Sequence, residues 1–317
     1  MDKVIAIVGP TAVGKTALSF SLANYFHTSL ISGDAYQIYR HMDIGTAKPT
    51  SAELAAYPHY LINIAEPGEP YSAARFCQMA GQEIHALNTA QKLPILVGGT
   101  GLYVQSLLEG YEFGAAKMDE TLKEAARKRI EHTTTEALQQ YIQDQTAWEP
   151  PDWHELLANR HRLIRLVGAI EKGEGRAFVR MGKAAGLVYD AYVIGLRLPR
   201  EVLYERIEKR IDVMLEMGWV DEVKRLLDMG ISPDSQAMKA IGYGEIIRYV
   251  QGQWSLQDAA LEIKKRTRHF AKRQLTWYKR MPYIHWYDKD RYASEDALAQ
   301  QVITDITLHY ERKDSYC

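Results

Sequence analysis

A phosphate-binding loop lies near the start of the chain and is its clearest chemical feature. The loop matches the pattern G-x-x-x-x-G-K-[ST] at every fixed position, with Gly9, Pro10, Thr11, Ala12, Val13, Gly14, Lys15 and Thr16. The backbone N–H groups of such a loop point at an anion, the lysine adds a positive charge, and the last hydroxyl can ligate Mg²⁺. The sequence therefore predicts a site that holds a chain of phosphates.

The segments on either side of the loop are those that this motif requires. The apolar run Val4–Val8 predicts a buried parallel strand, and the segment from Lys15 to about Phe26 predicts a helix with an apolar inner face. An accidental glycine turn would need neither of these neighbours. Because strand, loop and helix agree, we interpret the loop as a true phosphate site.

Asp34 is the next candidate, within Ile31-Ser-Gly-Asp-Ala-Tyr-Gln-Ile-Tyr39. In a nucleotide hydrolase, an acidic residue here would help to bind Mg²⁺ through water. Alternatively, it could take a proton from a nucleophile held beside the phosphates, or it could make only a turn hydrogen bond. Its position does not separate these readings, but Tyr36, Gln37 and Arg40 can stack, hydrogen-bond and pair with charge, which favours a loop that handles a substrate.

Two arginines, Arg206 and Arg210, are four residues apart on a predicted helix and therefore share a face. One of them could reach back to neutralise a leaving phosphate group. The alternative is an ordinary solvated basic face that pairs with Glu205 and Glu208. From the residues alone, the solvated face is slightly favoured.

A basic segment from residue 263 to 287 contains no acidic residue. Its cations are Lys264, Lys265, Arg266, Arg268, Lys272, Arg273, Lys279 and Arg280, interleaved with Phe270, Trp277 and Tyr278. Cations beside aromatic rings suit a nucleic-acid backbone with exposed bases. Although a charge run is usually a solvated face, the missing acids favour a polyanionic partner. A second basic patch could be formed by Arg160, His161, Arg162 and Arg165.

Strands and helices alternate over residues 1–114, which predicts a parallel sheet with helices on both faces. Leu93–Val97 predicts another buried strand, and it ends in Gly98-Gly-Thr-Gly101. Ligands of such sheets gather at the carboxyl ends of the strands. We therefore expect the phosphate loop, Asp34 and the glycine-rich segment after Val97 to lie together.

The alternation stops at residues 115–190, where the patterns predict only helices. These are expected at Asp119–His132, Thr135–Gln143 and Asp152–Glu171. A strand follows at 191–198, then helices near Arg200–Met217, Val220–Met229 and Lys239–Val250, a long helix from the N-cap Ser255 to about Lys279, a strand at Ile284–Tyr287 and a helix at Glu295–Glu311. The predicted fold is α/β: a P-loop NTPase-like parallel sheet formed by 1–114 and 191–317, with a helical insertion domain at 115–190.

Composition narrows the class of protein. The chain has 317 residues, 46% hydrophobic and 25% charged, with a formal net charge of −1, as in ordinary globular proteins. No apolar run reaches the ~20 residues that span a bilayer, and the first residues do not resemble a secretory signal. The two cysteines, Cys77 and Cys317, fit no zinc or disulfide pattern. We expect a cytoplasmic monomer that is not associated with a membrane.

Six sequence blocks together resemble the bacterial tRNA dimethylallyltransferase family. They are Gly9–Thr16, Asp34-Ala-Tyr-Gln-Ile-Tyr-Arg40, Met42-Asp-Ile-Gly-Thr-Ala-Lys-Pro49, Gly98-Gly-Thr-Gly-Leu-Tyr103, Ala237-Met-Lys-Ala-Ile-Gly-Tyr243 and Ala271-Lys-Arg-Gln-Leu-Thr-Trp277. The resemblance implies transfer of the dimethylallyl group of dimethylallyl diphosphate to N6 of adenosine 37, beside the anticodon of tRNAs that read codons beginning with U. The loop would then hold diphosphate, with Mg²⁺ as the cofactor.

The resemblance also implies roles for individual residues. Asp34 would be the general base, Thr100 would hydrogen-bond near the reacting amine, Arg210 would stabilise the leaving diphosphate, and Thr16 would ligate Mg²⁺. The tRNA, through its anticodon stem-loop, would contact Asp34, Ala35, Tyr36, Gln37, Thr100, Asn159, Arg160, His161, Arg162, Leu163, Ala240, Ile241, Gly242, Tyr243, Gly244, Glu245, Lys272, Arg273, Gln274, Trp277 and Lys279.

Two alternative functions are also compatible with the phosphate loop and Asp34. An adenylate isopentenyltransferase, which prenylates free AMP or ATP, would need the same loop and base. It would need neither a helical insertion nor a basic helix near the carboxyl end, so both features favour tRNA. A P-loop nucleotide kinase or nucleotide-binding module would turn over or bind ATP without prenyl transfer.

Overall fold

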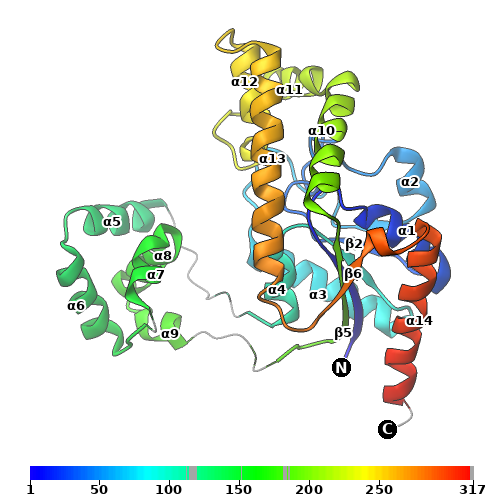
Figure 1. Cartoon of the computed structure of the whole chain (residues 1–317). Coiled ribbons are helices and arrows are strands. Elements are labelled where there is room, and N and C mark those ends of the chain that lie inside the picture. The colour runs from blue at the N-terminus through cyan, green and yellow to red at the C-terminus, as the bar shows by residue number, and fades with distance from the viewer. Residues whose placement is uncertain (112, 114–119, 151, 181–183, 185, 315–317) are drawn as a thin grey trace. The chain divides into compact units, whose positions relative to one another are not determined.

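The computed structural model describes the chain except for residues 112, 114–119, 151, 181–183, 185 and 315–317 (Figure 1). The chain divides into two compact units, one formed by residues 1–108 and 187–317 and the other by residues 109–186. The predicted division placed the boundaries a few residues away, at 114/115 and 190/191.

The first unit is built on a six-stranded parallel sheet, which confirms the predicted fold class. Its strands are β1 (Lys3–Val8), β2 (Leu30–Ser32), β3 (His59–Tyr60), β4 (Ile95–Val97), β5 (Asp190–Arg197) and β6 (Ile284–Asp288). They lie in the order β3-β2-β4-β1-β5-β6. Because both faces of a parallel sheet are covered, its strands are continuous apolar runs, as in β1, where all residues from Val4 to Val8 are buried.

The register of the central strands brings three strand ends together. Ser32 at the end of β2 and Ile7 in β1 both lie opposite Val97, the last residue of β4. The segments that follow these strands therefore leave the same edge of the sheet. These segments are the phosphate loop, the Asp34 segment and the glycine-rich turn after Val97.

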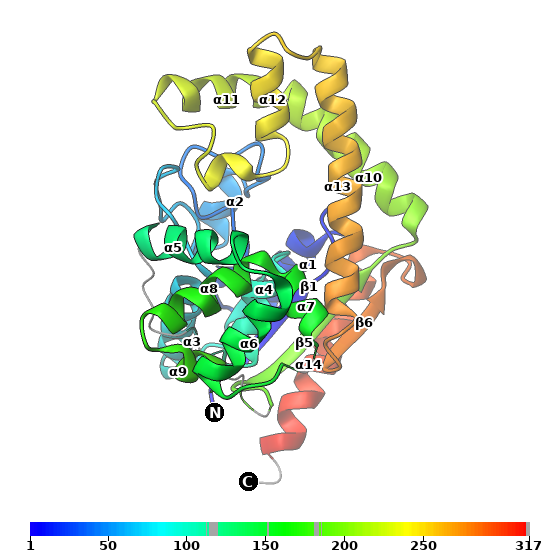
Figure 2. The same cartoon turned by 90° about the vertical axis from the view of Figure 1, so that its left-hand side faces the viewer.

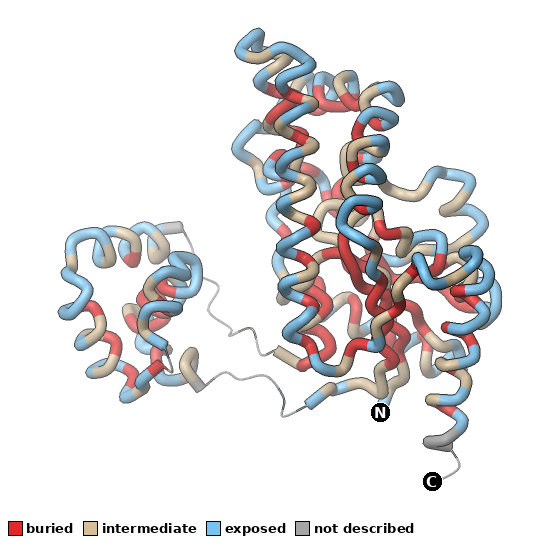
Figure 3. Tube along the Cα trace, in the orientation of Figure 1, coloured by how far each residue is buried: buried red, intermediate tan, exposed pale blue. Residues whose placement is uncertain are grey.

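Helices cover both faces of the sheet, and buried residues concentrate between the layers (Figures 1 and 3). On one face, α1 (Lys15–Phe26) packs against α14 (Glu295–Asp314). On the other, α3 (Ala73–Thr89) packs against α4 (Gly101–Leu108). The remaining short elements of this unit are α2 (Ser51–Ala56), η1 (Ala237–Lys239) and η2 (Lys289–Arg291).

Two long helices rise from the edge of the sheet that carries the strand ends (Figures 1 and 2). They are α10 (Arg200–Glu216) and α13 (Leu256–Tyr278), and they pack along each other. The shorter helices α11 (Trp219–Asp228) and α12 (Tyr243–Val250) lie at the far end of this pair. Ser255 caps α13 as predicted, because its hydroxyl accepts a hydrogen bond from the backbone N–H of Asp258 at 3.1 Å.

The second unit contains helices and has an apolar core of its own. Its helices are α5 (Glu120–Glu131), α6 (Thr135–Thr146), α7 (Trp153–Ala158), α8 (Arg160–Glu171) and α9 (Gly175–Arg180). Leu138, Ile142 and Leu166 are among the residues buried between them. The prediction of a single helix over 152–171 was wrong. Asn159 leaves the helical conformation and caps α8, accepting a hydrogen bond from the backbone N–H of Arg162 at 3.1 Å.

One further helix is shorter than predicted. The helix expected over 239–250 begins at Tyr243, because Gly242 has a φ of 102° and separates it from the turn of η1. Strand β3 has only two residues, since Leu61 and Asn63 have positive φ values of 63° and 56° and turn the chain away from the sheet. Within the described residues, no helix is long and apolar enough to cross a membrane.

Candidate active site

The phosphate loop joins the end of β1 to the start of α1. Gly14 has a φ of 101°, a left-handed conformation that glycine adopts without strain, and it stands at the N-cap of α1. The ammonium of Lys15 folds back over the loop and donates hydrogen bonds to the carbonyl oxygens of Gly9 at 3.0 Å and Pro10 at 2.9 Å. Backbone N–H groups, a helix N-terminus and a cation are thus held together, an arrangement that suits an anion.

Lys15, Arg210 and Asp34 come from three different elements and interact electrostatically. The pKa of Lys15 is lowered to about 8, first by burial of its ammonium and then by the positive charge of Arg210, while Asp34 acts in the opposite direction. Burial also lowers the pKa of Arg210, and Asp34 again opposes the shift. The predicted base and the two predicted cations therefore lie within electrostatic reach of one another.

Arg210 is not part of a solvated basic face, which was the slightly favoured reading of the sequence. Arg206, one turn earlier on α10, is exposed, whereas Arg210 is partly buried beside the phosphate loop. Glu208, expected to pair with these arginines, forms its ion pair with Arg268 on α13. The structure therefore separates the two arginines that the sequence placed on one face.

Asp34 lies in the turn that follows β2. Its Oδ1 accepts hydrogen bonds from the backbone N–H groups of Tyr36 at 2.9 Å and Gln37 at 3.3 Å. Among the described residues, no donor is bonded to Oδ2. The carboxylate thus makes the turn hydrogen bonds considered from the sequence and still presents an oxygen that can accept a proton.

Thr100 connects the Asp34 turn to the turn after β4. Its Oγ1 accepts a hydrogen bond from the backbone N–H of Ala35 at 3.0 Å. Close packing supports this contact, because a Cβ added at Gly98 would lie 2.5 Å from the carbonyl oxygen of Gly33. Only glycine allows the two turns to approach so closely, and Thr100 is thereby held beside the Asp34 turn.

Gln274 was predicted to contact tRNA, but the structure places its side chain inside the protein. Its Nε2 donates to the carbonyl oxygen of Gly99 at 2.7 Å, and its Oε1 accepts from the backbone N–H of Thr11 at 2.9 Å. This buried amide therefore joins α13 to the phosphate loop and to the turn after β4. The side chain is not available to a nucleic acid, and its position indicates that it braces both loops.

Two aromatic residues of α13 share this face, because 274, 277 and 278 are three and four residues apart. Tyr278 is buried, its hydroxyl donates to the carbonyl oxygen of Gly98 at 3.4 Å, and burial followed by the charge of Asp34 raises its pKa. It was expected among residues that suit exposed bases, and that expectation was wrong. Trp277 packs on Gly101 but keeps 38% of its surface exposed.

Half of the eight cations in the basic segment are paired with acids, and three of these four acids lie on other elements, which the lack of acids within residues 263–287 did not predict. The first half of the segment forms ion pairs: Lys264 with Asp212 at 2.6 Å, Lys265 with Glu262 at 3.2 Å, Arg266 with Glu245, and Arg268 with Glu208. Lys272, Arg273 and Lys279 are exposed and form no ion pair with any residue that the structure describes. The uncompensated charge is therefore confined to the end of α13 that lies next to the phosphate loop.

The segment 240–245 has few side chains available for the predicted tRNA contact. Ala240, Gly242, Tyr243 and Glu245 are buried, while Ile241 and Gly244 are partly exposed. The Tyr243 hydroxyl donates to Glu222 at 2.7 Å, and Glu245 accepts from the backbone N–H of Gly242 at 2.8 Å. The buried side chains thus stabilise the start of α12 and do not face solvent.

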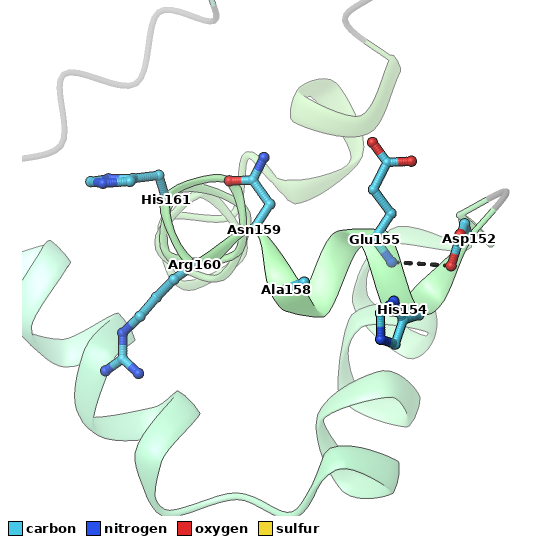
Figure 4. Close-up of a pocket in the computed structure, with 7 residues that line it drawn as sticks. All are labelled: Asp152, His154, Glu155, Ala158, Asn159, Arg160 and His161. Carbon is cyan, nitrogen blue, oxygen red and sulfur yellow. Dashed lines mark hydrogen bonds between the residues drawn. The ribbon is translucent and has the colours of Figure 1, made fainter. Parts of the chain in front are cut away.

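The predicted contact residues of the second unit lie where α7 meets α8. Figure 4 shows the shallow pocket at this junction, lined by Asp152, His154, Glu155, Ala158, Asn159, Arg160 and His161. Arg160 forms an ion pair with Glu131, and Arg162 lies over the ring of Trp148. His161 is exposed, whereas Leu163 is buried in the core of the unit. The pocket is lined by both acidic and basic groups, so its charge alone does not indicate that it binds an anion.

Two buried charged residues beside the site were missed by the sequence analysis. Lys289 follows β6, and its ammonium lies 2.6 Å from Glu295 Oε1 and directly against Gly14. Glu222 on α11 binds the segment that starts at Asp43. Lys289 could have been noticed because it directly follows a strand of the same sheet, but Glu222 has no such signal in the sequence.

Comparison with known proteins finds one family throughout. The family model described as IPP transferase matches residues 37–281. A protein of Alkaliphilus oremlandii named tRNA dimethylallyltransferase is 39% identical over 313 residues, covering 97% of this chain and 98% of the relative. A protein of the same name from Enterococcus faecalis is 40% identical over 290 residues, with coverages of 91% and 92%.

Solved structures give the same result. The full-length tRNA isopentenylpyrophosphate transferase of Bacillus halodurans is 36% identical, with a TM-score of 0.75, and the match covers 100% of this chain and 99% of that one. A eukaryotic dimethylallyltransferase acting on tRNA is 26% identical, with a TM-score of 0.75 and coverages of 96% and 78%.

Proposed function

The chain belongs to the IPP transferase family, and from this premise we propose that it is a tRNA dimethylallyltransferase. The dimethylallyl group would pass from dimethylallyl diphosphate to N6 of adenosine 37, in the anticodon stem-loop of tRNAs that read codons beginning with U. The bond between the prenyl carbon and the diphosphate oxygen breaks, and a bond from that carbon to N6 forms. The observation that carries the proposal is the electrostatic proximity of Asp34 to both Lys15 and Arg210.

Asp34 would act as the general base. The exocyclic amine is a poor nucleophile because its lone pair is delocalised into the purine ring, so loss of its proton must accompany formation of the new bond. The Oδ2 atom would accept this proton while Oδ1 remains bonded to the turn. Thr100, bonded to Ala35, would hydrogen-bond beside the reacting amine.

Lys15, the loop N–H groups and Arg210 would stabilise the leaving diphosphate. Negative charge grows on the bridging oxygen as the bond breaks, and fixed positive groups lower the energy of that state. The partly buried Arg210 is suited to this role because little water screens its charge. The phosphate loop would thus serve a leaving group, without any transfer of a phosphoryl group.

We propose that Thr16 holds Mg²⁺ together with the diphosphate oxygens. Thr16 is an exposed residue in the first turn of α1, directly after the phosphate loop. Mg²⁺ in phosphate sites usually has one or two protein ligands and otherwise binds phosphate oxygens and water. The ion would supply positive charge to the leaving group.

The end of α13 next to the phosphate loop would contact the tRNA. The exposed face of Trp277 beside Gly101 can stack a base, and Lys272, Arg273 and Lys279 can neutralise phosphates. The target base must leave its stack to reach Asp34, at a cost of a few kcal/mol. We also propose that the protein acts as a cytoplasmic monomer, and light scattering of the purified protein tests its oligomeric state.

A transfer assay tests the proposed function. Purified protein, Mg²⁺ and labelled dimethylallyl diphosphate are incubated with either tRNA or AMP, and we expect label in tRNA only. Label in AMP would support an adenylate isopentenyltransferase. Hydrolysis of ATP without label transfer would support a nucleotide kinase or binding module.

Exchanging Lys272 and Arg273 for alanine is expected to flatten the salt dependence of tRNA binding. If each cation neutralises one phosphate of a single-stranded loop, the slope of log K against log salt should decrease by roughly 1.4. The control is Lys264→Ala with Lys265→Ala, which removes equal charge from lysines already paired with Asp212 and Glu262. Equal slopes in the two double variants would show that the end of α13 does not contact the tRNA backbone.

The rate constant kcat/KM for dimethylallyl diphosphate is expected to fall as pH rises through about 8. The lowered pKa of Lys15 means that its charge is complete below this pH and is lost above it in the free enzyme. One unit above the pKa, only about a tenth of the lysine is protonated. The measurement is a pH profile at subsaturating diphosphate substrate. Lys15→Arg, which stays charged, should abolish the fall of kcat/KM above about pH 8. If the fall persists in that variant, another group causes it.

A further inference from the structure

Glu222 on α11 is a buried carboxylate with an unusual set of partners. Its Oε2 accepts hydrogen bonds from the backbone N–H groups of Asp43 and Ile44, each at 2.7 Å. Its Oε1 accepts from the backbone N–H of Gly45 at 3.0 Å and from the hydroxyl of Tyr243 at 2.7 Å. The side chain is 1% exposed, so these bonds replace its hydration.

These bonds fix the start of a segment that we call the 43–48 loop. A buried carboxylate is costly unless hydrogen bonds satisfy it, so the loop N–H groups and the carboxylate depend on each other. At the other end of the loop, the ammonium of Lys48 donates to Asn63 Oδ1 at 2.6 Å, to Asp43 Oδ1 at 2.8 Å, and to the carbonyl oxygen of Tyr39. Both ends of the loop are therefore anchored by charged side chains.

The middle of the 43–48 loop holds the side chain of Gln37. The Nε2 of Gln37 donates to the carbonyl oxygens of Thr46 and Ala47, both at 3.3 Å, and its Oε1 accepts from the hydroxyl of Ser32 at 3.0 Å. The backbone N–H of the same residue donates to Asp34 Oδ1 at 3.3 Å. Gln37 thus bonds the 43–48 loop through its amide and the Asp34 carboxylate through its main chain.

We propose that Glu222 is a positioning residue for the general base, acting through the 43–48 loop and Gln37 on Asp34. This inference rests on the proposed function, because it assigns Glu222 a part in proton removal from the adenine amine. The carboxylate does not touch the substrate. It fixes the loop whose carbonyl groups orient Gln37, and Gln37 in turn sets the direction of Asp34 Oδ1 and hence of Oδ2. Misplacing a catalytic group by about 1 Å can cost 100-fold in rate.

The test is Glu222→Gln, with Asp221→Asn as the matched control. The glutamine keeps the shape of the side chain but presents two donors to the loop N–H groups at one end. We expect kcat at saturating substrates to fall about 10-fold to 100-fold, with the tRNA dissociation constant changed less than about 3-fold. Asp221 is the exposed neighbour on α11 and pairs with Lys224, so its variant should retain wild-type kcat.

A double-mutant cycle with Asp34→Ala separates positioning from general loss of structure. If Glu222 acts through the base, Glu222→Gln should cause less than a 2-fold further fall in the Asp34→Ala background. A fall as large as in the wild-type background would mean that the substitution merely reduces the folded fraction, and it would overturn the proposal. An unchanged kcat in the single variant would overturn it equally.

Hydrogen exchange gives a readout that does not depend on turnover. In the wild-type protein, the amides of Asp43, Ile44 and Gly45 should exchange slowly, and in Glu222→Gln they should exchange at least about 10-fold faster while β1 stays protected. Unchanged protection would overturn the proposal even if the wild-type protein transferred no prenyl group. If the glutamine variant does not fold, Gln37→Ala tests the next link, and the same kcat loss is expected at saturating tRNA. Full activity of Gln37→Ala would reject the link.

Discussion

Replacing Asp34 with alanine is expected to lower the transfer rate by at least ~100-fold at saturating substrates, with tRNA still bound. A positioned general base contributes typically 10²–10⁴-fold, and Asp34 is the acidic side chain that interacts with both Lys15 and Arg210. The measurement is single-turnover transfer of label to tRNA, together with a filter-binding measurement of tRNA affinity.

Asp34→Asn distinguishes a role of Asp34 as the general base from a role in shaping the turn. The asparagine can still accept the hydrogen bonds from Tyr36 and Gln37 through its oxygen, so the turn should keep its shape. It cannot accept the proton of the amine at any accessible pH. We expect it to be as slow as the alanine variant. Near-normal turnover of the asparagine variant would show that the aspartate only shapes the turn.

The strand ends and the phosphate loop could be predicted from the sequence because their signals are local. A buried parallel strand is an uninterrupted apolar run, and the loop after β1 must contain glycines at fixed positions. Once the strands are assumed to be parallel, their carboxyl ends fall on one edge. That step alone predicted that Asp34 and the turn after β4 would lie beside the phosphate loop, as the register of β1, β2 and β4 shows.

The orientation of α13 could not be predicted, because it depends on which elements pack against the helix. The cations at its start meet acids on α10 and α12, such as Asp212 and Glu245, which are distant in sequence. In the sequence, Gln274 is one more polar residue of a basic helix. Only the structure shows that its amide bonds Thr11 and Gly99. The role of Glu222 was even harder to predict, because its partners are mostly backbone groups, which no pattern of side chains in the sequence reveals.

Replacing Arg210 with glutamine is expected to lower the transfer rate by about 10²–10³-fold, the usual cost of removing one group that stabilises developing negative charge. The matched control is Arg206→Gln, one turn earlier on α10 but exposed, which should stay near wild type. Measuring kcat at saturating diphosphate substrate distinguishes a transition-state role from simple binding. If the two variants behave alike, Arg210 is only part of a basic surface.

The same substitution makes a second prediction that a structural defect would not mimic. The positive charge of Arg210 is one of the causes that lower the pKa of Lys15, so removing this charge should raise that pKa. The fall of kcat/KM for dimethylallyl diphosphate with rising pH should then begin above its wild-type value of about 8. A rate loss without this shift would place Arg210 too far from Lys15 to share the diphosphate, whereas loss and shift together would assign both cations to the same leaving group.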